Sequence, residues 1–232
     1  METSAIQECS LFFEFQAIEQ GFSRIAGLDE VGRGALFGPV CVAAVILDLQ
    51  RVPSGIRDSK KLNPKQRQVL AENIRETAVC CSTAFVEADE IDQINILQAT
   101  IKALQAAILG LMQKPDYLLI DGTLKAGLEI PEKSIVRGDA LSASIGAASI
   151  VAKVARDQLV SALAAVYPGY DLSRNKGYGT AVHLEALSRL GPTDRHRRSF
   201  RGVQIWLQQD PVVDFPSFKW TSLETRIGNG FK

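Results

Sequence analysis

The sequence lacks the features that mark several large classes of protein. No apolar stretch approaches the roughly 20 residues that a membrane-spanning helix needs, and the first residues show no basic region followed by an apolar signal segment. The four cysteines have no metal-ligand spacing. Internal repeats and low-complexity segments are absent as well. We therefore expect a soluble, cytoplasmic protein whose cysteines are reduced.

An excess of charge of either sign is also missing. The 26 Lys and Arg residues balance 26 Asp and Glu residues, so composition gives no global argument for a polyanionic partner. Basic residues nevertheless gather in three segments, 57–67, 174–176 and 195–201. Each segment alone is more typical of a solvated surface than of a binding site, and the sequence does not show whether the three converge.

The pattern of apolar residues predicts a mixed sheet with helices on its faces. The expected strands are 23–29, 40–47, 78–86, 117–120 and 134–136, and the first two form a hairpin. The expected helices are 7–20, 65–77, 89–111, 141–166 and 181–189, with a last turn or two over 203–208. Apolar residues of the N-terminal helix are expected to pack on the sheet, and Asp89 or Asp92 to cap the long helix. Asp58 is expected in a turn or cap.

The most unusual stretch is Ala26–Gly34, in which an apolar strand ends in Asp29-Glu30 and Gly-Arg-Gly follows. Adjacent carboxylates oppose each other's ionisation unless a cation neutralises them. An Asp-Glu pair by itself is more commonly a solvent-facing strand end. The glycines beside it and the acids downstream favour a metal site with an arginine that faces a phosphate.

Two further expected strands end in acids, namely Asp121 and Asp139. Sites form at strand ends in open α/β sheets, and carboxylates without His or Cys ligands select Mg²⁺ or Mn²⁺. Two such ions can activate a water and stabilise a leaving oxygen in phosphoryl transfer. Because consecutive strand residues point to opposite faces, we expect a twist or bulge at Glu30. Asp157 is either another ligand or, as we favour, an ion-pair partner of Arg156 or another base.

Together these segments resemble the type 2 ribonuclease H family over most of residues 10–202. The matching motifs are Gly27–Gly34, Asp58–Leu62, Glu90–Leu97, Ile120–Gly122, Gly138–Ala140, Ala147–Asp157, Gly177–Thr180 with His183, and His196–Phe200. Many motifs in the right order are more specific than any one of them. Ala35 and Phe37 depart from the family pattern, which often has Pro and Ala there.

The resemblance implies an RNase H-like α/β fold, a mixed central sheet flanked by helices with a small helical C-terminal part. It divides the chain into a catalytic domain over 1–165, a helical substrate-binding part over 166–210, and a tail over 211–232 that we expect to be mobile. We also expect a monomer.

The resemblance also implies the chemistry. Its catalytic, metal-binding acids are Asp29, Glu30, Asp121 and Asp139, with Mg²⁺ or Mn²⁺ as cofactor. Gly32, Arg33 and Gly34 match the loop that recognises the ribonucleotide, and Tyr178 matches the tyrosine at the RNA-to-DNA junction. Lys60, Lys61 and Lys153 are candidate phosphate ligands, with plain surface charge as the alternative. The histidines His183 and His196 are expected to fix loop structure, and for Tyr178 the alternative is a loop tyrosine that covers the core.

The implied enzyme is an endoribonuclease that hydrolyses RNA in RNA–DNA hybrids. It would also nick duplex DNA on the 5′ side of a single embedded ribonucleotide, leaving 3′-hydroxyl and 5′-phosphate ends. A type 3 enzyme is the nearest alternative, but it carries an extra N-terminal domain and lacks this Gly-Arg-Gly. A non-catalytic nucleic-acid-binding protein would not need all four acids, and a phosphatase for small substrates would not need the basic motifs.

Overall fold

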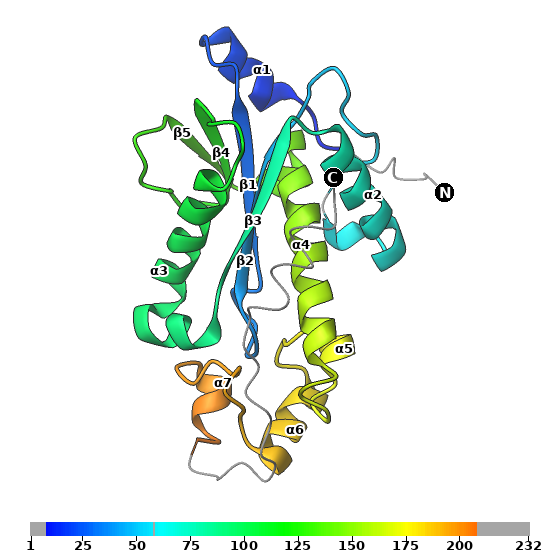
Figure 1. Ribbon diagram of the computed structural model, residues 1–232, viewed down its shortest axis with the longest axis vertical. Coiled ribbons are helices and arrows are strands. Elements are labelled where there is room, and N and C mark those ends of the chain that lie inside the picture. Colours follow the sequence, from blue (N-terminus) through cyan, green and yellow to red (C-terminus); the bar gives the residue numbers. More distant parts are fainter. Residues whose placement is uncertain (1–7, 58, 208–232) are drawn as a thin grey trace, which may run out of the picture.

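The computed structural model describes residues 8–57 and 59–207, and its centre is a five-stranded sheet in the order β3-β2-β1-β4-β5 (Figure 1). The strands are Ile25–Val31 (β1), Val40–Ile46 (β2), Cys80–Val86 (β3), Tyr117–Asp121 (β4) and Glu132–Ile135 (β5). β2 is antiparallel to both β1 and β3, whereas β4 is parallel to both β1 and β5. This mixed sheet confirms the predicted fold class and the predicted hairpin of the first two strands.

Helices cover both faces of the sheet (Figure 1). The helix α3 (Ala88–Leu109) lies on one face, and α2 (Pro64–Thr77) and α4 (Ala143–Leu163) lie on the other. Val42 of β2 belongs to the apolar cluster under α3, and its neighbour Ala43 belongs to the cluster under α4. A strand that is covered on both faces needs apolar residues throughout, which explains the continuous apolar run of β2.

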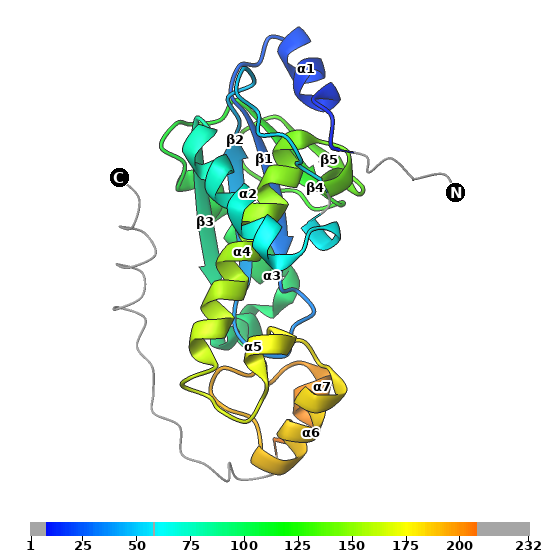
Figure 2. The same cartoon turned by 90° about the vertical axis from the view of Figure 1, so that its right-hand side faces the viewer.

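The C-terminal helices gather at one end of the sheet, beyond the end of α4 (Figure 2). They are α5 (Leu172–Asn175), α6 (Ala181–Leu190) and α7 (Arg201–Gln204), and they share an apolar cluster with Phe37 and Leu159. The division of the chain at residue 165 stays a prediction. Asp58, Gln208 and the predicted tail lie outside the described residues. Within the described residues, none of the helices is both long and apolar enough to cross a membrane.

The N-terminal helix α1 (Phe12–Glu19) is rotated away from the prediction. Phe12, Phe15 and Ile18, which were expected to pack on the sheet, are 57%, 50% and 40% exposed, whereas Glu14 is fully buried. The reason is polar: Glu14 Oε1 accepts hydrogen bonds from Ser142 Oγ at 2.6 Å and from the Ser144 N–H at 2.8 Å, at the start of α4. This anchor sets which face of α1 points inward.

The long helix α3 is interrupted at Asn95, whose backbone has a φ of 68° and a ψ of 164°, values outside the helical range. The Asn95 Oδ1 accepts from the N–H groups of Leu97 and Gln98, which caps the second half of the helix. The predicted cap at Asp89 or Asp92 is wrong, since the N-cap is Glu87. Asp92 instead accepts from the Arg198 N–H, which ties α3 to the C-terminal part.

Candidate active site

Strand β1 carries Asp29 and Glu30 at its C-terminal end. Its pairing with β2 runs without interruption, with Asp29 opposite Ala43 and Glu30 opposite Val42, so of the twist or bulge predicted at Glu30 the bulge is wrong. No bulge is needed because β4 ends at Asp121 and leaves no strand beside Glu30 on that side. The Glu30 side chain therefore lies close enough to Asp121 to feel its charge, although it leaves the opposite face of the strand from Asp29.

The other two acids reach the same end of the sheet from different elements. Asp121 is the last residue of β4, next to the pairing of Leu28 with Ile120. The predicted strand over 134–136 ends one residue earlier, at Ile135, so Asp139 lies in the short 3₁₀ helix η2 (Gly138–Ala140) and not directly at a strand end. The Asp139 N–H donates to Asp121 Oδ1 at 3.2 Å. The structure thus brings the four predicted acids together.

The electrostatics of this cluster are those of crowded carboxylates. Asp29 is only 7% exposed, and burial, followed by the charges of Glu30 and Asp121, raises its pKa well above the usual range, against a hydrogen bond with Ser149. Burial also raises the pKa of Glu30, an effect that Arg33 opposes by donating from Nη1 to Glu30 Oε1 at 3.2 Å. Such a cluster is stabilised by a cation, which offsets the repulsion.

The residues present fit a hard divalent cation, because their donor atoms are all carboxylate oxygens. Glu30 Oε2 is buried without a hydrogen-bond partner, as expected of an oxygen kept for another ligand. As placed, however, no group of three or more Asp, Glu, His or Cys side chains in residues 8–57 and 59–207 is arranged to hold a metal ion.

The Gly-Arg-Gly loop after β1 divides into two parts. Gly32 has a φ of +90°, and a Cβ there would lie 2.0 Å from Arg156 Nε, so the fold itself requires this glycine. Gly34 is exposed, and a Cβ there would meet no atom within 4 Å. The sequence predicted that both glycines contact the ligand, whereas in the structure Gly32 packs on Arg156 and only Gly34 has free space beside it.

Two buried arginines hold the segment that follows the loop. Arg156 donates to the carbonyls of Phe37 and Pro39, and Arg197 donates to the carbonyls of Gly38 and Arg33. Sequence reasoning missed both roles, since it treated Arg156 as a partner for Asp157 and Arg197 as part of a surface cluster. The sequence does contain one sign of a buried role for Arg156, namely its position within an otherwise apolar helix. Burial, and the charge of Arg156, lower the pKa of Arg197 to about 9, so it remains charged at neutral pH.

Tyr178 lies beside the Gly-Arg-Gly loop. It forms an isolated antiparallel bridge with Ala35, and its half-buried ring has Lys153 Nζ at 5.7 Å and Arg156 Cζ at 5.4 Å from its centroid. The Tyr178 carbonyl bonds to His183 Nδ1 at 2.9 Å, and His183 Nε2 lies 3.1 Å from His196 Nε2. As expected, the two histidines fix the loop.

Their protonation states follow from the partners at each end. His196 Nδ1 accepts from the Thr193 N–H at 2.9 Å, so its proton is on Nε2 and is donated to His183 Nε2. The proton of His183 is then on Nδ1, where it is donated to the Tyr178 carbonyl. Burial lowers the pKa of both imidazoles, most strongly that of His196. Both rings are therefore neutral links between residues 193–196 and residues 176–180, which we call the tyrosine loop.

The predicted lysines occupy two places. Lys60 and Lys61 belong to the 3₁₀ helix η1 (Ser59–Lys61), where both are exposed, and Lys60 Nζ lies 3.7 Å from Asp139 Oδ2. Lys153 Nζ donates to Asp157 Oδ1 at 2.8 Å. Asp157 also lies 3.8 Å from Arg67 Nη1. Asp157 is thus an ion-pair partner of bases other than Arg156, and it lies apart from the four acids.

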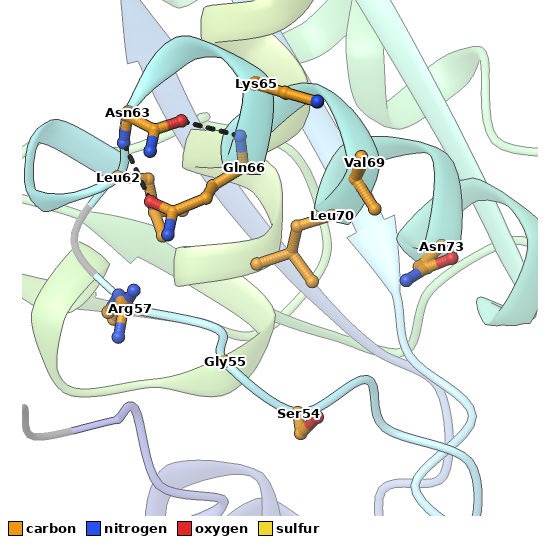
Figure 3. Close-up of a pocket in the computed structure, with 10 residues that line it drawn as sticks. All are labelled: Ser54, Gly55, Arg57, Leu62, Asn63, Lys65, Gln66, Val69, Leu70 and Asn73. Carbon is orange, nitrogen blue, oxygen red and sulfur yellow. Dashed lines mark hydrogen bonds between the residues drawn. The ribbon is translucent and has the colours of Figure 1, made fainter.

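Two hollows lie outside the acid cluster. One of about 470 Å³ lies between residues 54–57 and the start of α2, with Leu62 and Leu70 on its wall (Figure 3). Another of about 530 Å³ is lined by α2, α4 and α5 and includes Asp157 and Lys176. None of the four acids lines either hollow.

Comparison with known proteins identifies the family. A sequence model of the family described as Ribonuclease HII matches residues 26–203. The chain belongs to the Ribonuclease HII family. It is 49% identical over 212 residues to the Ribonuclease HII of Chlamydia trachomatis serovar A, a match that covers 89% of this chain and 97% of that protein. It is 47% identical over 210 residues to that of Koribacter versatilis, covering 90% and 82%.

Solved structures agree in fold. The ribonuclease H2 of Pyrococcus horikoshii has a TM-score of 0.69 at 23% identity, covering 80% of this chain and 98% of that one. The RNase HII of Archaeoglobus fulgidus, solved in complex with PCNA, has a TM-score of 0.67 at 24% identity, covering 77% and 96%. An RNase HIII solved with Mn²⁺ has a TM-score of 0.58 at 21% identity, covering 79% and 64%. As a member of the family, the chain is a ribonuclease H, which acts on RNA–DNA hybrids and depends on a divalent metal.

Proposed function

We propose that this ribonuclease H also nicks duplex DNA on the 5′ side of a single embedded ribonucleotide, leaving 3′-hydroxyl and 5′-phosphate ends. The observation that carries this proposal is the bridge between Ala35 and Tyr178, which joins the Gly-Arg-Gly loop to the tyrosine loop at the acid-bearing end of β1. A device that reads one sugar and the next would need these two loops at a fixed separation.

In this proposal the four acids, Asp29, Glu30, Asp121 and Asp139, hold two divalent cations, Mg²⁺ or Mn²⁺. When bound there, such cations would supply an activated water and stabilise the charge on the leaving oxygen. The surrounding residues of the chain orient the acids. The Ser149 hydroxyl favours the charged form of Asp29 and so opposes the rise of its pKa, and the Asp139 N–H donates to Asp121 Oδ1, so two of the four carboxylates have a polar partner in the chain.

Sugar selection follows from the open face of Gly34. The 2′-hydroxyl is the group that distinguishes RNA from DNA, and a backbone without a Cβ can approach it closely. Gly32 acts indirectly, through its packing on Arg156, and Arg33 holds the loop against Glu30. The ring of Tyr178 is placed to stack on the neighbouring deoxyribose, where a 2′-hydroxyl would obstruct it.

Lys60, Lys61 and Lys153 are proposed as phosphate ligands on either side of this point. We propose that the enzyme acts as a monomer, since all four acids come from one chain, and that it works in the cytoplasm, which suits its four free thiols.

The experiment is a cleavage map on a DNA duplex that contains one ribonucleotide, with Mg²⁺ and with Mn²⁺. We expect a single nick on the 5′ side of the ribonucleotide. Asp121→Asn should abolish cleavage and leave duplex binding largely intact, whereas the matched change Asp89→Asn, at an exposed position of α3, should leave both unchanged. Cleavage of a continuous hybrid without nicking of this duplex would refute the proposal, and full turnover by Asp121→Asn would refute the role of that acid.

A further inference from the structure

The turn that carries Lys60 and Lys61 is held by a residue of α2. Arg67 is only 9% exposed, and its guanidinium donates from Nε to the Ser59 carbonyl at 2.9 Å and from Nη2 to the Leu62 carbonyl at 2.8 Å. It therefore grips both ends of residues 59–62, which we call the lysine turn. A guanidinium donates to the two carbonyls from different nitrogens held in one plane, which fixes their separation more strictly than an ammonium group, whose donors share one nitrogen, can do.

The helix that presents Arg67 is itself fixed at its start. Asn63 and Gln66 form a capping box, in which each side chain accepts from the other's backbone N–H, at 2.9 and 3.1 Å (Figure 3). Pro64 occupies the first helical turn. Arg67 follows directly, and its own N–H donates to the Asn63 carbonyl at 3.0 Å. The lysine turn and its clamp are thus one rigid unit.

On its other side the lysine turn touches the acid cluster twice. Ser59 Oγ lies 3.0 Å from Ser149 Oγ, and the Ser149 hydroxyl acts on Asp29 by lowering the pKa of that carboxyl against the effect of burial. Lys60 Nζ lies 3.7 Å from Asp139 Oδ2. A shift of the lysine turn would therefore change the surroundings of both Asp29 and Asp139.

The clamp is also linked to the tyrosine loop through Asp157. This carboxylate lies 3.8 Å from Arg67 Nη1 through Oδ2, and its Oδ1 accepts from Lys153 Nζ at 2.8 Å. Lys153 in turn lies over the ring of Tyr178. A continuous set of interactions thus runs from Asp29 through the lysine turn, Arg67, Asp157 and Lys153 to Tyr178.

We propose that Arg67 and Asp157 are positioning residues for the cleavage reaction. They hold the lysine turn and Lys153 at a fixed separation, so that phosphates near the acids and phosphates near Tyr178 are bound in one register. Neither residue touches the substrate. The inference rests on the proposed function, because it takes Lys60, Lys61 and Lys153 to be phosphate ligands.

The test is a double-mutant cycle on the single-ribonucleotide duplex, with KM and kcat measured for Arg67→Met, for Lys60→Ala with Lys61→Ala, and for the triple variant. If Arg67 acts through the lysines, Arg67→Met raises KM by about tenfold in the natural chain and by less than about twofold when both lysines are already gone. A purely structural role would lower activity by the same factor in both backgrounds.

A second readout is the dependence of KM on salt. Removing a phosphate ligand lowers the slope of log KM against log salt, by about one for each such ligand that is removed. We expect Arg67→Met to lower this slope although Arg67 touches no phosphate. The matched control is Arg75→Met, the same change on the same helix at a half-buried position away from the turn, which should leave KM and the slope unchanged.

Asp157→Asn should raise KM in the same direction as Arg67→Met, because the amide keeps the shape and loses the charge that Arg67 and Lys153 share. Where Arg67→Met fails to fold, Arg67→Lys, which retains the charge but presents its donors from a single nitrogen, enters the same cycle. The proposal would be overturned if Arg67→Met raised KM by the same factor with and without the two lysines. It would also be overturned if Arg67→Met left KM and the salt slope unchanged. Should the natural enzyme not nick this duplex, the proposed function fails, and the cycle run on a continuous RNA–DNA hybrid still decides the role of Arg67.

Discussion

Replacing Gly27 by alanine should destabilise the protein strongly, because β1 lies directly against the backbone of α4 at this point. A Cβ on Gly27 would lie 2.1 Å from the carbonyl carbon of Ser144, 2.3 Å from its oxygen and 2.5 Å from the Ile145 nitrogen. These are main-chain atoms of a helix, which cannot rotate away as a side chain can. The strand that bears Asp29 and Glu30 would have to separate from α4.

The size of the effect follows from the overlap. Overpacked cores lose about 1–3 kcal/mol, and a clash with backbone belongs at the upper end, about 3 kcal/mol. For a chain of this size each kcal/mol lowers Tm by about 2–4 °C, so Gly27→Ala should lower Tm by about 6–12 °C. Thermal unfolding followed by circular dichroism, without substrate, measures this shift.

The matched control is Gly34→Ala, since a Cβ there meets no atom within 4 Å. Its Tm should stay within about 2 °C of the natural protein, as for ordinary surface changes, while its discrimination between ribonucleotide and deoxyribonucleotide falls. The reasoning would be refuted by a Gly27→Ala protein that melts at the natural temperature, or by a Gly34→Ala protein that melts as early as Gly27→Ala should.

Two further predictions concern the anchors of the tyrosine loop and of α4. Burial lowers the pKa of His183 and His196. Below about pH 6.5 the two imidazoles therefore bind protons in the unfolded chain but not in the folded protein. The contribution of the two histidines to stability is full above that pH and is lost as the pH falls below it. The free energy of unfolding, measured by urea titration, should thus fall by about 1–2 kcal/mol between about pH 7.5 and pH 5. The fall should be smaller in His196→Asn. An equal fall in that variant would contradict the role given to His196. Glu14→Ala removes the acceptor of the Ser142 hydroxyl and the Ser144 N–H, and it should lower the free energy of unfolding, measured in urea, by about 1–3 kcal/mol. The control Glu19→Ala, at an exposed position of the same helix, should lower it little. An equal loss in both variants would contradict the role of Glu14 as an anchor.

Those parts of the fold that depend on local pattern could be predicted from the sequence. The continuous apolar run of β2 predicts a strand buried on both faces, and Asn63-Pro64 predicts the start of α2. The acids could be found because each follows or ends an apolar strand, and topology alone then brings strand ends together. That pattern gives Asp121 its place, and it misplaces Asp139 only by the short η2.

The remaining features depend on partners that are distant in sequence. The inward face of α1 is set by Glu14 and the start of α4, which outweighs the apolar stripe that periodicity predicted. Arg156 and Arg197 take backbone carbonyls as acceptors, and since every residue has a carbonyl, no residue type marks the partner. The same holds for Arg67, whose two acceptors are the carbonyls of Ser59 and Leu62.

Arg156 bears on why recognition of the sugar and cleavage would occur at one place. Arg156 donates to the carbonyls of Phe37 and Lys176, so a single guanidinium sets the separation between the chain that leaves the Gly-Arg-Gly loop and the chain that enters the tyrosine loop. Gly32 packs on that same side chain. Strand β1 pairs with β2 without a break through Asp29 and Val31, the residue just before Gly32. The backbone of Tyr178 is thus tied to the chain that leaves the acid-bearing strand through Arg156 and through its bridge with Ala35. A sugar that fits between Gly34 and Tyr178 would accordingly place its phosphate at one definite position relative to the acids, and a sugar that does not fit would leave the phosphate out of reach.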